Sequence, residues 1–118
     1  MIEKEFWVFL EGRSKTDILS KSTVTGDVVM DAAGKFICGH ALLPKDYDNL
    51  TEEEIEAIGD LLFQKNIGQR TKEAILILLA HQISDIALTI LTRFNLNPDK
   101  ALMYFARFAL DESLMWNE

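Results

Sequence analysis

Few residues of this chain could carry out chemistry on a substrate. Its two histidines, His40 and His81, lie in different segments, and His81 is expected at a helix end, bonded to backbone carbonyls or water. The single cysteine, Cys38, lies among apolar residues, which disfavour the reactive thiolate. Cys38 and His40 could share a metal ion only on an extended strand, and two ligands are too few for a zinc site. We therefore expect no metal and no cofactor.

Other catalytic patterns are also missing from the sequence. The glycines do not have the spacing of a nucleotide-binding loop. The acidic segment that begins at Asp46 lacks the glycine and the glutamate of a calcium-binding loop, since Thr51 and Ala57 occupy those positions. Paired carboxylates such as Glu56 and Asp60 remain, but on so polar a face they are expected to be solvated charges. We predict that the chain is not an enzyme.

The elements that would position these residues have helical patterns. The clearest helix begins at Thr51, because Thr51 and Glu54 have the spacing of a capping box, in which each side chain bonds the other's backbone N–H. Apolar residues then recur on one face of this helix. They are Ile55, Ile58, Leu61 and Leu62. The segment 66–68 is predicted to end it.

Three more helices are expected towards the C-terminus. The segment 71–82 is apolar on all sides, which indicates a central helix or a buried strand, and its flanking residues favour the helix. Ser84 is the predicted cap of a helix over 84–94. Pro98 is predicted in the first turn of a last helix over 98–114.

The first fifty residues are less regular. Residues 2–10 predict a short aromatic-rich helix that Gly12 ends. Over 27–41, apolar pairs recur every four residues, which favours a helix. The segment 31–35, between two apolar runs, would equally suit the turn of a β-hairpin within residues 24–43.

One set of residues has the pattern of a helical hairpin. Ser84-Asp85-Ile86-Ala87 and Ile90-Leu91 precede an Asn97-Pro98-Asp99 turn, and Phe105-Ala106 and Ala109-Leu110 follow it. This pattern, over about residues 84–112, resembles the repeat unit of HEAT-like proteins, in which one helix ends at an Asn/Asp-Pro turn and the next packs through Ala and Leu. The resemblance implies a scaffold for binding.

Together these patterns predict an all-α protein with one domain over residues 1–118. It is expected to be a helical bundle or a short HEAT-like helical stack. The alternative is an α+β protein with one β-hairpin within residues 24–43.

The charge of the chain limits its partners. Twelve Lys and Arg against 19 Asp and Glu give a net charge of −7. Coulomb repulsion disfavours direct binding to nucleic acid or to an anionic membrane. The longest apolar run, residues 74–80, is far shorter than the ~20 residues that span a bilayer. One cysteine fits a reducing compartment, so a cytoplasmic protein is expected. The sequence does not indicate the oligomeric state.

Acidic residues gather on the outer face of the Thr51 helix and just before it, with aromatic residues among them. The predicted partner-binding residues are Asp46, Tyr47, Asp48, Glu52, Glu53, Glu56, Asp60 and Phe63. An aromatic residue in an acidic rim is typical of a binding hot spot for a basic partner. The alternative for Phe63 is that it packs beneath a neighbouring helix.

Two functions fit these features. In size and charge the chain resembles bacterial immunity proteins, which neutralise toxin domains that are often nucleases; this resemblance in class predicts an inhibitor that covers a basic toxin domain. The alternative is a HEAT-like adaptor or assembly subunit without enzymatic activity. It would bind through an apolar groove made by Phe6, Trp7, Phe9 and Trp116. The simpler interpretation of these aromatic residues is that they belong to the core or dock the two ends of the chain.

Overall fold

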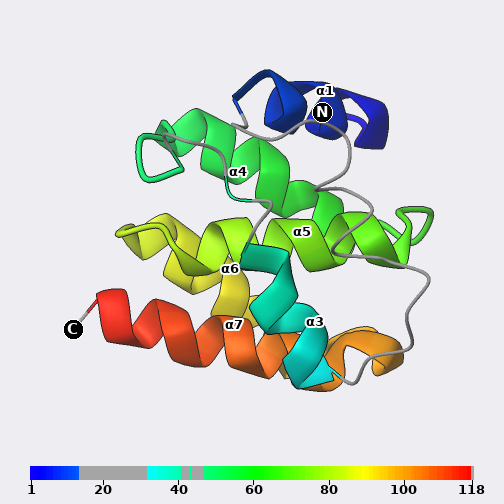
Figure 1. Ribbon diagram of the computed structural model, residues 1–118, viewed down its shortest axis with the longest axis vertical. Coiled ribbons are helices and arrows are strands. Elements are labelled where there is room, and N and C mark those ends of the chain that lie inside the picture. Colours follow the sequence, from blue (N-terminus) through cyan, green and yellow to red (C-terminus); the bar gives the residue numbers. More distant parts are fainter. Residues whose placement is uncertain (14–31, 41–42, 44–46, 118) are drawn as a thin grey trace.

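The computed structural model describes residues 1–13, 32–40, 43 and 47–117, and all regular secondary structure in them is helical. The α-helices are α1 (Glu3–Arg13), α3 (Ala32–Gly39), α4 (Glu52–Asp60), α5 (Gln69–Ala80), α6 (Asp85–Leu96) and α7 (Met103–Trp116) (Figure 1). Two short 3-10 turns, η2 (Leu61–Phe63) and η3 (Lys100–Leu102), follow α4 and precede α7. The prediction of an all-α fold is confirmed. None of the described helices is long and apolar enough to cross a lipid bilayer.

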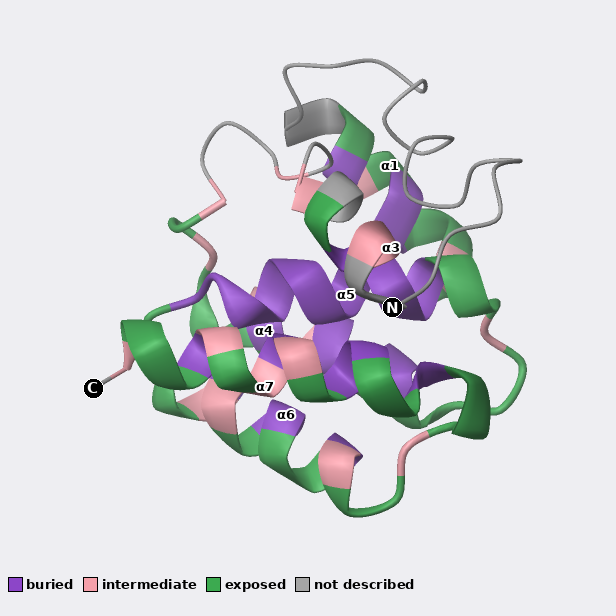
Figure 2. Cartoon of the chain, turned by 60° about the horizontal axis from the view of Figure 1, so that its bottom comes forward, coloured by how far each residue is buried: buried purple, intermediate pink, exposed green. Residues whose placement is uncertain are grey.

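Helix α5 is the centre of the bundle. Every residue from Thr71 to Ala80 is buried, and α3, α4, α6 and α7 all pack against this helix (Figure 2). A helix that is apolar on all sides needs neighbours on all sides, so the sequence pattern explains this position. The helix begins earlier than predicted, at Gln69, because Gly68 rather than Thr71 precedes its first turn.

Helix α1 is attached to the start of α5 by a small polar network. The indole Nε1–H of Trp7 donates to the Thr71 hydroxyl at 2.9 Å, and that hydroxyl donates to the Glu3 carboxylate. Phe6 and Trp7 are buried in the core, as expected for core residues, so their rings cannot line the alternative apolar groove. Gly12 does not end α1, which continues to Arg13.

Helix α4 begins as predicted and ends earlier. The Thr51 hydroxyl accepts from the Glu54 N–H at 3.1 Å, and the Thr51 N–H donates to the Glu54 carboxylate at 2.9 Å, so the capping box is confirmed. The α-helix ends at Asp60 instead of at residues 66–68, because the chain tightens into η2. Gly59 allows α4 to approach α6 closely, since a Cβ at this position would lie 2.6 Å from Cδ1 of Ile90.

The last two helices form a hairpin. Ser84 caps α6 as predicted, its hydroxyl accepting from the Ala87 N–H at 3.3 Å. The prediction that Pro98 opens the final helix is wrong. Asp99 is extended and binds the buried Lys72 ammonium at 2.7 Å, so the chain passes through η3 before α7 begins at Met103.

The ambiguous N-terminal segment contains a helix. The residues that would have formed the hairpin turn, Gly34 and Lys35, lie inside α3, which rules out a turn there. Phe36 of α3 packs edge-on against Phe105 of α7, with ring centroids 5.3 Å apart. The rest of the predicted hairpin segment, residues 24–31 and 41–42, lies outside the described residues.

Candidate functional site

The outer face of α4 borders two adjoining hollows beside α6. One has a volume of about 460 Å³ and the other about 290 Å³, and Asp85 and Ile86 line both. We call the two hollows together the acidic groove. Its five carboxylates are those of Asp48, Glu52, Glu56, Asp60 and Asp85.

The spacing of the α4 acids explains why they lie in one row. Glu52, Glu56 and Asp60 are four residues apart, so their side chains follow one another along a single face of the helix. The opposite face buries Ile55 and Ile58 in the core. Packing of α4 against α6 then places the row beside Asp85, which is in the first turn of α6.

The charges of the acidic groove are not balanced within the described part of the chain. All five carboxylate residues are exposed, and no described cation lies within ion-pair distance of any of them. Arg93 of α6 lines the larger hollow, but its guanidinium lies over the ring of Phe63, 4.8 Å from the centroid. Like charges four residues apart on a helix repel one another, so a cation from a partner would relieve this repulsion.

The other predicted site residues lie outside the acidic groove. Tyr47 is half-buried and packs edge-on against the ring of His81, at 5.7 Å between centroids. Glu53 is exposed and does not line either hollow. Phe63 is 43% exposed, packs edge-on against Phe94, and lies next to the groove through its contact with Arg93. Asp46 lies outside the described residues.

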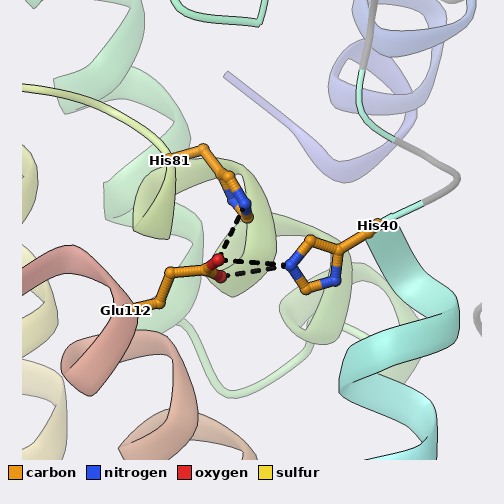
Figure 3. Close-up of side chains that lie close together, drawn as sticks. All are labelled: His40, His81 and Glu112. Atoms are coloured by element: carbon orange, nitrogen blue, oxygen red, sulfur yellow. Dashed lines mark hydrogen bonds and ion pairs between the residues drawn. The ribbon is translucent and has the colours of Figure 1, made fainter. Parts of the chain in front are cut away.

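A second polar cluster lies where α3, α5 and α7 meet (Figure 3). His40 directly follows α3, His81 is the C-cap of α5, and Glu112 is in α7. The Nε2 atom of His40 is 3.2 and 3.4 Å from the two Glu112 oxygens, and Nε2 of His81 is 3.1 Å from one of them. His81 is buried, and the side chains of Glu112 and His40 are 18% and 34% exposed.

Backbone contacts determine the tautomer of both histidines. Nδ1 of His40 is 2.7 Å from the Phe36 carbonyl oxygen, and Nδ1 of His81 is 2.8 Å from that of Ile77. A carbonyl oxygen only accepts hydrogen bonds, so each Nδ1 must carry the hydrogen. In a neutral ring the Nε2 atom then presents a lone pair, and both lone pairs face the Glu112 carboxylate, which only accepts when it is ionised. A metal ion between them would satisfy all three groups, as would a proton on a ring or on the carboxylate.

The surroundings of this cluster favour positive charge. Helices α3 and α5 both end directly before these histidines. The partial negative charge at each helix C-terminus adds to the charge of the Glu112 carboxylate. The ring centroids of His40 and His81 are only 4.8 Å apart, so one positive charge placed between the two rings avoids the repulsion of two separate ones.

Part of each site is visible in the sequence. The helix-end position and backbone bond expected for His81 are confirmed. The neighbour of His40 in the sequence that could share a metal ion with it is Cys38, whereas the structure brings His40 to His81 and Glu112. Glu112 and Asp85 were not predicted as site residues, because only tertiary packing brings them to their partners.

No family model, curated protein or solved structure matches this chain. The described part of the chain is an all-α bundle with two candidate sites, the acidic groove between α4 and α6 and the histidine–carboxylate cluster among α3, α5 and α7.

Proposed function

We propose that this chain is a binding module for a basic protein and that the acidic groove is its binding surface. The observation that carries the proposal is the row of five exposed carboxylates along two adjoining hollows, with no described cation paired to them. The net charge of −7 has the same sign, so the whole molecule attracts a basic partner towards this surface.

The lining of the groove fits lysine and arginine side chains of a partner. Ile86 and Ile90 supply apolar surface between the acids of α4 and Asp85. The methylene stems of a long basic side chain can pack on such surface while its charged group bonds the carboxylates. Phe63, partly exposed and next to the groove, adds an aromatic contact at one end.

The proposal extends to an immunity protein that inhibits a cognate bacterial toxin. A nuclease toxin has a basic site shaped for phosphates, and a row of carboxylates can occupy it without any reaction. Such a protein acts in the cytoplasm, by binding alone. It needs no cofactor and has no enzymatic activity.

A HEAT-like adaptor is the second candidate function. Helices α6 and α7 pack as a hairpin in which Ala106 and Ala109 are buried, as expected for such a unit. At the end of α7, Leu114, Met115 and Trp116 are exposed apolar residues. An adaptor would use this surface in place of the acidic groove.

The direct test is association with any basic toxin domain encoded by a gene next to the gene of this chain. The groove variant carries Glu52→Lys, Glu56→Lys and Asp60→Lys. The control variant carries Glu5→Lys, Glu11→Lys and Asp111→Lys, three exposed acids that line neither hollow. Three charge reversals raise the net charge by six in both variants, from −7 to −1.

The groove variant is expected to associate at least about tenfold more slowly at low salt, and the control variant much less so, because steering depends most on charges near the contact. Phe63→Ala is expected mainly to speed dissociation. Absence of complex and of inhibition would refute the proposal. Equal loss in both variants would show that net charge, and not the groove, is responsible. Loss of binding on truncation of Trp116 at high salt would favour the adaptor.

A further inference from the structure

We infer that His40, His81 and Glu112 form a binding site for a divalent transition-metal ion, with Zn²⁺ as the ion that fits best. This site is separate from the acidic groove and goes beyond the proposed function. It lies among α3, α5 and α7 (Figure 3), whereas the groove lies between α4 and α6.

The distances within the cluster are those of ligands around one ion. Two ligands bound about 2.1 Å from a tetrahedral ion stand about 3.4 Å apart. The distances from the imidazole Nε2 atoms to the Glu112 oxygens are 3.1 to 3.4 Å. All three ligand atoms lie within 4.8 Å of one another, so small side-chain rotations bring them onto a single ion.

The second ring nitrogen of each histidine is held as in known metal sites. Metal-binding histidines donate their other N–H to a backbone carbonyl or a carboxylate, which fixes the tautomer and the ring orientation. Here Phe36 and Ile77 supply those carbonyls, each four residues before its histidine at the end of a helix. Both Nε2 lone pairs are thereby directed at the same place, next to the carboxylate.

The ligand types indicate the class of ion. Two imidazoles and one carboxylate suit Zn²⁺ and its neighbours in the first transition series, whereas Mg²⁺ and Ca²⁺ prefer oxygen ligands. One dication also satisfies both lone pairs and the carboxylate together, without placing positive charge on two adjacent rings. Three protein ligands leave one tetrahedral position for water or for another group.

Binding of the ion would cross-link helices α3, α5 and α7. The ligands come from the end of α3, the end of α5 and the body of α7, so the complete site exists only when these helices are packed. An ion that binds only the folded chain stabilises it. We expect Zn²⁺ to raise the melting temperature and to bind with a stoichiometry of one.

The test uses Zn²⁺ and Co²⁺ as probes of the full chain. Zn²⁺ is titrated by calorimetry, and Co²⁺ by its visible absorption and by quenching of tryptophan fluorescence, because the Trp116 and His81 ring centroids are 6.4 Å apart. His40→Gln and Glu112→Gln each remove one ligand and are expected to weaken binding by more than about 100-fold. Asp111→Asn, an exposed neighbour of Glu112, should leave binding unchanged.

Two further measurements keep the outcome unambiguous. Circular dichroism verifies that each variant is folded. His40 is more exposed than Glu112, so His40→Gln remains informative even where loss of the Glu112 carboxylate disturbs packing. Cys38→Ser should retain the site. The inference is overturned if the folded wild type binds neither ion in the micromolar range, if binding persists in both ligand variants, or if it disappears with Cys38→Ser. Stabilisation by Ca²⁺ or Mg²⁺ equal to that by Zn²⁺ would also contradict it.

Discussion

The contact between α4 and α6 can be tested at one glycine. Gly59 is buried at this contact, and a Cβ added there would lie 2.6 Å from Cδ1 of Ile90 and 3.1 Å from its Cγ2. Rotation about χ2 can move Cδ1 away. The Cγ2 atom cannot follow, because a β-branched side chain in a helix has one strongly preferred χ1. Gly59→Ala should therefore force α4 and α6 slightly apart.

Two opposing effects determine the size of the change. An extra methyl group in a packed core costs about 1–3 kcal/mol, whereas alanine is better than glycine inside a helix by about 1 kcal/mol. Gly59→Ala should thus lower the free energy of unfolding by about 1 kcal/mol. With Ile90→Ala the clash is removed, and the same substitution should raise the free energy of unfolding by up to about 1 kcal/mol. The expected coupling between the two positions is about 2 kcal/mol.

Urea denaturation of the wild type, both single variants and the double variant measures this coupling. Ile90→Ala alone should cost about 2–5 kcal/mol, so the comparison is made within each background. A reversal of sign between the backgrounds supports the close approach of the two helices. An effect of Gly59→Ala that is the same in both would refute it, and with it the described shape of the acidic groove, which Ile90 lines.

Single contacts elsewhere in the bundle give two further predictions. Thr51→Ala removes the α4 cap and should lower the free energy of unfolding by about 1 kcal/mol in thermal denaturation, whereas Thr92→Ala, at an exposed position within α6, should not lower it. Asp99→Asn leaves the buried Lys72 ammonium without its carboxylate and should cost about 2 kcal/mol in urea denaturation. Lys72→Met, which removes the charge as well, should cost less; a larger loss than for Asp99→Asn would contradict this account.

Local signals in the sequence predicted much of the fold. The capping box at Thr51, the cap at Ser84 and the continuous apolar run of α5 each depend on residues close together in the chain, and each is confirmed. The start of α7 was predicted wrongly for the opposite reason. Lys72 lies far from Asp99 in sequence, so the local pattern could not predict the ion pair between them. Asp99 directly follows Pro98.

The two sites differ in the same respect, since one follows from local spacing and the other from tertiary packing. Helical spacing alone placed Glu52, Glu56 and Asp60 on one face, where the structure has them. The cluster of His40, His81 and Glu112 depends on three helices packing at one point. No pattern along the chain links a histidine that follows one helix to a glutamate 72 positions later.

Hydrogen exchange of the complex with the basic toxin domain tests the central claim, that the acidic groove is the binding surface. Backbone amides of α4 and of the first turns of α6 should gain protection when the partner binds, and the exposed end of α7 should not. Protection confined to the end of α7, with α4 exchanging as in the free protein, would contradict the account.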